Sequence, residues 1–196
     1  MAIIKLILIM ASAFSHAIAA VAIGKISRAA RWPGDLDKVD LKFWLIAIFC
    51  AVSPDFDAIG FWLGVPYDSV WGHRGITHSL FFAGLLSYVM VHFFYSEEKV
   101  FSRRWLILFL FFFAVTASHG ILDAMTDGGR GVAFFAPFNN ARYFFPFRPI
   151  RVSPISITRF FSGRGWEVLK SEFVWVWIPS FILMAVAPLI KKLRTT

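Results

Sequence analysis

Cysteine is nearly missing from this sequence: Cys50 is the only one in 196 residues. One cysteine can form neither a disulfide within the chain nor a cluster of thiolates around a metal ion. Any metal that the chain binds must therefore be held by nitrogen and oxygen atoms, from histidine and carboxylate side chains.

Charged residues are also scarce. They make up 16% of the chain and hydrophobic residues 58%, whereas about a quarter of the residues in a soluble domain are charged. This composition excludes an ordinary soluble enzyme and indicates an integral membrane protein. The formal net charge is +8, but the lysines and arginines lie in the gaps between apolar runs, as they do beside anionic lipid. We therefore expect no nucleic-acid partner.

The apolar residues gather in runs, several of which approach the roughly 20 residues that a helix needs to cross a membrane. The runs cover Ile3–Ile23, Phe43–Val65 with a polar interruption, Leu80–Tyr95, Trp105–Leu122 and Phe173–Ile190. They predict an all-α fold, an integral membrane helix bundle of about four to five transmembrane helices, as one membrane-embedded domain over residues 1–196. The stretch over about 124–172 is predicted to be a long extramembrane loop rich in aromatic and basic residues.

The first run has a second interpretation. Lys5 followed by Ala11-Ser12-Ala13 is typical of a cleaved signal peptide. Because the apolar run continues well beyond that point and carries His16, we expect a retained helix. The basic residues of the short gaps favour an N-terminus outside the membrane, since the gaps that would then lie inside contain Lys25, Arg28, Arg31, Lys38, Lys42, Lys99, Arg103 and Arg104.

Residues able to bind a metal ion are concentrated at a few places in this apolar chain. They lie at His16, Pro54-Asp55-Phe56-Asp57, His73-Arg74-Gly75-Ile76-Thr77-His78-Ser79 and His119-Gly120-Ile121-Leu122-Asp123. Ionisable residues inside a membrane are costly and usually mark a functional site. The start of the third run and the end of the fourth must lie on the same membrane face, so one level of the membrane contains His73, His78, His119 and Asp123. The sequence therefore predicts a polar metal site near one membrane face.

The spacing of these residues suits a metal ion but leaves other roles open. His119 and Asp123 stand four apart and share a helix face, like two ligands of one ion, or like a ligand and the carboxylate that orients it. Asp55 and Asp57 follow a proline and can supply one or two oxygen ligands. Each group also has a structural interpretation: Asp55 as a helix cap, the His119–Asp123 pair as packing, and His16 as a hydrogen bond between helices.

Other polar residues have simpler expected roles. Ser79 or Thr77 is expected to cap the helix that follows them. His92 has no acidic neighbour in its apolar run and has no expected role beyond packing. Cys50 is expected to pack or to contact lipid.

The same motifs resemble those of a known family. Pro54-Asp55-Phe56-Asp57, the His73–Ser79 block and the His119–Asp123 block are similar to motifs of the YdjM/YbcI family of bacterial inner-membrane proteins, which are regarded as metal-dependent hydrolases. The order of the histidines and carboxylates is also similar to that in the zinc-dependent phospholipase C and P1 nuclease superfamily. No histidine follows His119, which departs from that superfamily's cluster of three metals. The resemblance thus implies one or two metal ions in a multi-pass protein of the bacterial inner (cytoplasmic) membrane.

The resemblance also implies an activity: a membrane-bound metal-dependent hydrolase that cleaves a phosphoester of a lipid or lipid-linked substrate by metal-activated water. Zinc is the first expected ion, with manganese or iron as alternatives. The expected metal ligands are His16, Asp55, His73, His119 and Asp123. The site is expected on the outer, periplasmic side of the membrane.

The expected catalytic residues are Asp57, Arg74 and His78. Asp57 would orient the attacking water as a general base or join the ligands, Arg74 would bind the phosphate by a bidentate contact, and His78 would ligate the ion or support its ligands. The expected partners are membrane lipid and a phosphate-containing, lipid-like substrate, and the sequence leaves protein partners unknown. Two other classes stay open: a metal-ion or proton transporter, and a structural membrane protein whose buried polar cluster fixes helix packing.

Overall fold

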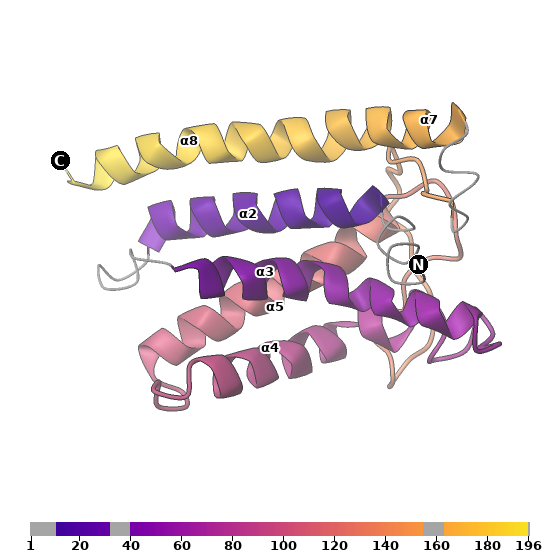
Figure 1. The fold of residues 1–196 in the computed structure, drawn as a ribbon, viewed down its shortest axis with the longest axis horizontal. Coiled ribbons are helices and arrows are strands. Elements are labelled where there is room, and N and C mark those ends of the chain that lie inside the picture. Colours follow the sequence, from indigo (N-terminus) through magenta and orange to yellow (C-terminus); the bar gives the residue numbers. More distant parts are fainter. Residues whose placement is uncertain (1–10, 32–39, 155–162, 196) are drawn as a thin grey trace.

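A computed structural model describes residues 11–31, 40–154 and 163–195 of the chain (Figure 1). Within these ranges the structure is helical, with two isolated β-bridges and no strand. The helices are α2 (Ala11–Arg31), α3 (Leu41–Val52), α4 (Leu80–Phe94), α5 (Arg103–Ala124), α7 (Gly163–Glu172) and α8 (Ile178–Thr195). Shorter elements are the 3-10 helices η2 (Ser53–Phe61) and η3 (Ile76–His78) and the π-helical turn η4 (Phe173–Trp177).

The predicted all-α membrane helix bundle is confirmed. Among the described residues, three helical stretches are long and apolar enough to cross a membrane, namely Leu41–Phe61, Arg103–Ala124 and Gly163–Leu193, and α4 is a shorter apolar helix. The first predicted run, Ile3–Ile23, lies partly outside the described residues, and its described part belongs to α2.

The helices lie side by side along the long axis of the molecule (Figure 1). Helix α2 lies between α8 and α3, and α5 contacts α2, α3 and α4. Helix α8 packs on α2 and presents large apolar side chains outward, among them Phe181, Ile182 and Leu189. A helix with such an outer surface is suited to contact with lipid.

One half of the bundle has an apolar core. Phe43 of α3 stacks on Phe111 of α5, with ring centroids 4.7 Å apart, and Phe112 is fully buried beside them. Leu108 and Val91 complete this core from α5 and α4. Phe43 lies in the first turn of α3, and the other core residues lie in the first half of α5 and the last turn of α4. The start of α5 and the end of α4 meet at the left end of Figure 1.

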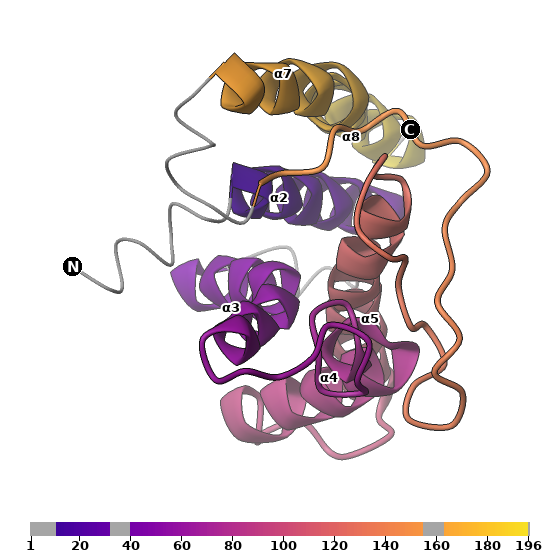
Figure 2. The ribbon, with the colours of Figure 1, turned by 90° about the vertical axis from the view of Figure 1, so that its right-hand side faces the viewer.

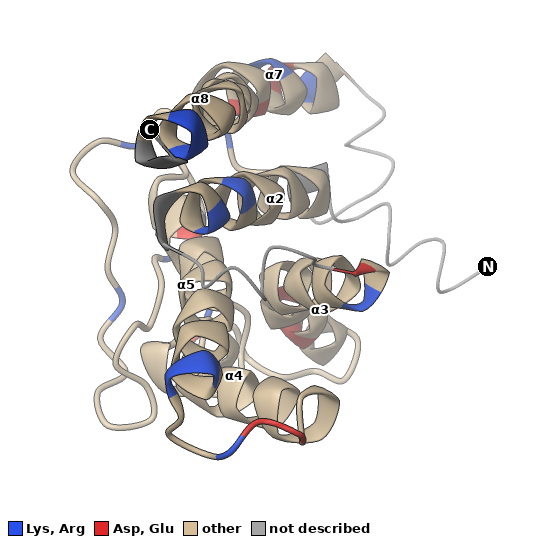
Figure 3. Ribbon diagram, turned by 90° about the vertical axis from the view of Figure 1, so that its left-hand side faces the viewer, with Lys and Arg blue, Asp and Glu red and all other residues tan. Residues whose placement is uncertain are grey.

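Basic residues gather at that same end of the bundle. Figure 3 faces it and shows lysines and arginines at the ends of α2 and α8 and at the start of α5. In the sequence these are Lys25, Arg28, Arg103, Arg104, Lys191 and Lys192. Such a group of cations beside apolar helices is typical of the flank of a membrane-spanning segment.

Helix boundaries follow from side-chain caps. The side chains of Asp40, Ser79 and Ser102 accept hydrogen bonds from the backbone N–H groups of Phe43, Phe82 and Trp105, which have no partner inside the helix. The prediction that Ser79 caps the third apolar run is confirmed.

Two predicted loops are shorter than expected. Helix α2 continues to Arg31, so much of the gap between the first two predicted runs is helical. The last part of the predicted loop over 124–172 forms α7. The reason is amphipathic packing: Gly165, Val168 and Glu172, three and four residues apart, are buried on one face of α7, while its other residues are half-buried or exposed.

The chain between η2 and α4 is folded into tight turns that position the histidines. The N–H of Gly75 donates to the carbonyl of Gly72 at 2.9 Å, and the N–H of Ile76 donates to the carbonyl of Val70 at 2.8 Å. A side-chain carbon at Gly75 would clash with the carbonyl oxygen of Val70, which is backbone and cannot move aside. Glycine is therefore required here for the close approach of two backbone segments.

Gly75→Ala is expected to lower the free energy of unfolding in detergent by about 1–3 kcal/mol, the usual cost of overpacking. Gly84→Ala is the matched control, because no atom lies within 4 Å of the position that its side-chain carbon would take. Thermal unfolding of the two purified variants beside the wild type tests this. Equal unfolding midpoints for Gly75→Ala and the wild type would contradict the structure of these turns.

Candidate metal centre

The polar residues meet at the end of the bundle opposite the apolar core. Figure 2 faces this end, where the start of α2, the η2 segment, the start of α4 and the end of α5 come together under the loop over 125–154. Backbone hydrogen bonds attach the loop: the N–H of Ala133 donates to the carbonyl of Arg74, and that of Leu80 to the carbonyl of Phe134, both at 3.0 Å.

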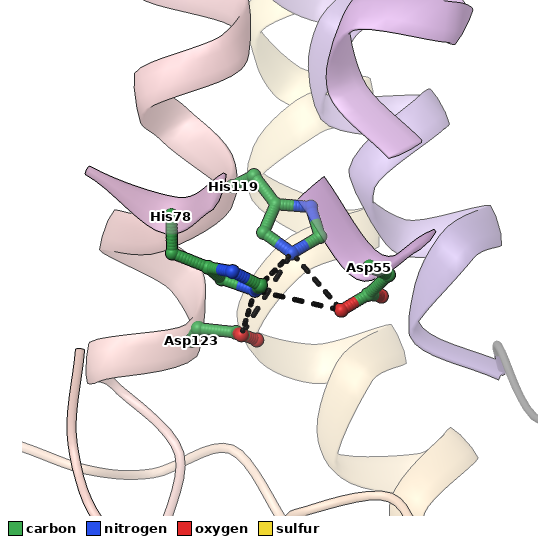
Figure 4. A group of neighbouring side chains, drawn as sticks. All are labelled: Asp55, His78, His119 and Asp123. Carbon is green, nitrogen blue, oxygen red and sulfur yellow. Dashed lines mark hydrogen bonds and ion pairs between the residues drawn. The ribbon is translucent and has the colours of Figure 1, made fainter. Parts of the chain in front are cut away.

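Four of these residues direct their ligand atoms to one point: Asp55, His78, His119 and Asp123 (Figure 4). The Nε2 atoms of the two histidines are 3.1 Å apart. Asp55 Oδ1 lies 3.5 Å from His78 Nε2 and 3.3 Å from His119 Nε2. Asp123 Oδ2 lies 3.2 Å from His78 Nε2 and 3.7 Å from His119 Nε2.

The outer nitrogens of both histidines already have partners. His119 Nδ1 lies 2.7 Å from the carbonyl oxygen of Ala51, which can only accept, so this nitrogen carries a hydrogen. His78 Nδ1 is hydrogen-bonded to the hydroxyl oxygen of Thr77 at 3.1 Å and lies 3.2 Å from Asp57 Oδ2. Because the Thr77 hydroxyl donates its single hydrogen to Asp57 Oδ2, His78 Nδ1 is assigned a hydrogen as the donor. Two neutral rings would then direct nitrogen lone pairs at each other across 3.1 Å. A cation, either a proton on one ring or a metal ion between them, removes that repulsion.

The distances fit a tetrahedral ion. Ligand atoms around zinc with bonds of 2.0–2.1 Å are separated by about 3.3 Å, and five of the six separations among these four nitrogen and carboxylate atoms run from 3.1 to 3.7 Å. The set contains two nitrogens and two oxygens and no sulfur, as the scarcity of cysteine requires. The backbone carbonyl of Ala51 on His119 and the carboxylate of Asp57 on His78 are the outer partners that orient metal-binding histidines.

The electrostatics of the group also favour a cation. Burial opposes a positive charge on His78, but the carboxylates of Asp57, Asp123 and Asp55 outweigh burial and hold the pKa of its imidazole well above the usual value. The group thus attracts positive charge strongly, which either a proton or a divalent ion can supply.

His16 lies beside this group and outside the set of four. Its ring stacks on that of His119 with centroids 3.7 Å apart, and its Nε2 lies 3.9 Å from Asp123 Oδ1. Helix α2 thus reaches the level of the other histidines. The contacts of His16 hold the His119 ring in place from the side.

Asp57 and His73 form a hydrogen-bonded pair next to the four residues of the metal-binding group. His73 Nδ1 lies 2.6 Å from Asp57 Oδ1, and Asp57 Oδ2 also accepts hydrogen bonds from the hydroxyl of Thr77 at 2.5 Å and the backbone N–H of Arg74 at 3.1 Å. Asp57, His73 and His78 also have ligand atoms close enough together for an ion. The oxygens of Asp57 are thus already engaged by donors around it.

Arg74 connects the metal-binding group to the loop above it. Its Nε lies 3.0 Å from Asp123 Oδ2, and its Nη1 donates to the hydroxyl of Thr126 at 3.0 Å and the carbonyl of Gly128 at 3.1 Å. Its backbone φ is 62°, a left-handed conformation that costs free energy for a residue with a side chain. The surrounding contacts hold it there and direct its side chain at Asp123.

A cavity of about 270 Å³ opens next to the group. Its wall includes Asp55, His73, Arg74 and Asp123, and it continues past Tyr67, Thr126, Ile150, Arg151 and Glu172. The cavity therefore gives a small molecule access to the polar residues from the end of the bundle.

Sequence reasoning missed several residues of this site. Arg142 donates to the carbonyls of Tyr67 at 2.8 Å and His73 at 3.0 Å and so holds the turns that carry the histidines, but nothing in the local sequence distinguishes it. Glu172 lines the cavity and is 2% exposed. A carboxylate directly before the fifth apolar run was a signal for it.

Cys50 is fully buried in the apolar core, as expected. His92 is instead exposed on α4, where its ring stacks on that of Tyr88 with centroids 5.7 Å apart.

Comparison with known proteins agrees with these motifs. Residues 10–193 match the YdjM inner membrane protein family. The chain is 37% identical over 137 residues to the inner membrane protein YbcI of Escherichia coli (strain K12), covering 70% of this chain and 78% of that protein. No solved structure matches the chain. The helices able to span a membrane, the motifs gathered at one end of the bundle and this similarity agree, and the chain belongs to the YdjM inner membrane protein family.

Proposed function

We propose that this protein is a metal-dependent hydrolase of the inner membrane that cleaves a phosphoester of a lipid or lipid-linked substrate. One observation carries the proposal: two histidine nitrogens and two carboxylate oxygens lie at separations that suit a tetrahedral ion, and the two carboxylates, Asp55 and Asp123, line an open cavity. Four protein ligands by themselves can form a closed structural site, and the cavity beside Asp55 and Asp123 is what favours a catalytic one.

The proposed ion is one zinc, which Asp55, His78, His119 and Asp123 would hold. A zinc ion would supply a Lewis acid for a phosphoryl oxygen and an acidified water at neutral pH, with the water as a fifth ligand, because catalytic zinc can expand its coordination from four to five. Relative to the expectation from sequence, His78 takes a ligand role and His73 a catalytic one. We exchange the two roles because His78 Nε2 faces the carboxylates of Asp55 and Asp123, whereas His73 lines the cavity.

In this proposal His73 accepts the proton of the attacking water. Asp57 binds its Nδ1 at 2.6 Å, which leaves Nε2 as the basic nitrogen, and the ring lies on the cavity wall. Asp57 acts as the residue that orients both His73 and His78, because donors already engage both of its oxygens. Arg74 holds Asp123 in place and adds positive charge to the wall where a phosphate would bind.

The apolar core supports an enzyme over a transporter. An ion path would need polar groups along the bundle, but the described residues between the site and the opposite end are largely apolar, with Phe43, Leu108 and Phe112 at the centre. The cluster therefore has one open side, toward the cavity.

A lipid substrate is supported by the surface around the cavity. Large apolar side chains are exposed at this end of the bundle, including Trp62, Trp71, Phe138, Phe147 and Trp166. Aromatic residues of this kind collect at the membrane–water interface, where lipid phosphates lie. The basic residues of α2, α5 and α8 gather at the other end, which supports a site on the outer side of the membrane. The basic residues of the long loop lie at the site end and argue the other way, but long loops count less for orientation.

Metal content tests the proposal directly. Protein purified in detergent is expected to contain about one equivalent of zinc, and the double variant His78→Ala/His119→Ala is expected to lose it, because two of the four ligands are gone. His92→Ala is the matched control, since His92 stacks on Tyr88 away from the site. Elemental analysis of the three proteins is the measurement. A wild type without any metal, even after addition of zinc, excludes the hydrolase.

His73→Gln separates catalysis from metal binding. We expect kcat for a fluorescent phospholipid or for a phosphodiester such as bis(p-nitrophenyl) phosphate to fall about 100- to 1,000-fold, the usual contribution of a general base, with zinc content unchanged. His92→Gln should keep full activity. Loss of zinc in His73→Gln would instead identify His73 as a ligand and reject its role as the base.

A further inference from the structure

One carboxylate of the cavity wall is not explained by the metal centre. Glu172 is the last residue of α7, immediately before the π-helical turn η4, and it is 2% exposed while lining the cavity. Local π-helical turns occur frequently at functional sites.

Glu172 is oriented by a short chain of hydrogen bonds. The hydroxyl of Ser15 donates to Glu172 Oε2 at 2.8 Å, and the indole N–H of Trp177 donates to the oxygen of Ser15 at 2.8 Å. Because the indole can only donate, it directs the single hydroxyl hydrogen of Ser15 toward the carboxylate. The side chain is thus held in one position at the cavity.

Glu172 differs from the other carboxylates around the cavity in its charge environment. Asp123 is paired with Arg74 at 3.0 Å, and Asp55 lies 3.3 Å from the Nε2 atom of His119. Among the described residues, no lysine, arginine or histidine lies within ion-pair distance of Glu172, whose one hydrogen-bond partner is Ser15. A buried carboxylate without a cation is costly, and a ligand that brings a cation removes that cost.

We propose that the cavity binds a zwitterionic phosphoester headgroup, with the phosphate at the metal centre and a primary ammonium group on Glu172. This inference rests on the proposed function, because it takes the same cavity as the substrate site. The substrate class is then a phospholipid of the phosphoethanolamine type.

The recognition is by hydrogen bond and charge together. An ionised carboxylate only accepts, so it favours an ammonium with N–H groups over a quaternary ammonium that has none. An aromatic cage for a quaternary ammonium is not offered by Tyr67, because Arg130 and Arg142 already contact its ring at 5.6 and 5.1 Å from the centroid.

The test is lipid binding by the full chain in detergent, with zinc present. Fluorescent-tail phosphatidylethanolamine, phosphatidylcholine and phosphatidylglycerol are compared, with soluble glycerophosphoethanolamine as competitor. The wild type is expected to bind the ethanolamine lipid roughly tenfold more tightly than the other two, as for a charge-assisted hydrogen bond. Glu172→Gln is expected to lose this preference, and Ser15→Ala to weaken it.

Glu167→Gln is the matched control, since Glu167 lies on the same helix with 61% of its side chain exposed, and it should keep the preference. Competition by glycerophosphoethanolamine separates recognition of the free headgroup from recognition that needs the lipid tails. Equal affinity of the wild type for all three lipids, or an unchanged preference in both Glu172→Gln and Ser15→Ala, overturns the inference. Zinc content and turnover measured on the same samples report on the proposed function independently.

Discussion

The site depends on the meeting of His78 and His119, whose Nε2 atoms lie 3.1 Å apart in a buried environment. Both rings have their other nitrogen engaged, by Asp57 and by the carbonyl of Ala51. This arrangement requires a positive charge between the rings, and the neighbouring carboxylates stabilise one. The surrounding contacts, from the stacking of His16 to the turns around Gly75, hold the two rings in that geometry.

The two ends of the bundle differ in the side chains that they contain. One end is an apolar core, with basic residues at the ends of the helices around it, which suits an anchor in the membrane. The other end contains the polar cluster, the cavity and exposed aromatic side chains. In the proposed function, such a division would position water-requiring chemistry at the level of lipid headgroups, where a phosphoester is accessible without leaving the membrane.

Local patterns predict some parts of this site and miss others. Asp55, His119 and Asp123 could be identified from the sequence because polar residues in apolar runs are costly. Since consecutive membrane-spanning helices run in opposite directions, the sequence also predicted that the histidines at the start of the third run and the end of the fourth lie at the same depth in the membrane. The choice between His73 and His78 was beyond such reasoning. Both lie in one short motif, and the tight turns decide that His78 Nε2 faces Asp55 and Asp123 while His73 faces Asp57.

The sequence by itself determined the helical membrane bundle and the absence of sulfur ligands, because hydrophobic run length and cysteine count are properties of the chain alone. The tertiary structure decided which side chains converge. Arg142 reaches back to the carbonyls of Tyr67 and His73, and Glu172 meets Ser15 from the first helix. These contacts join residues dozens of positions apart, and they exist only because helix packing brings distant segments together at one end of the bundle.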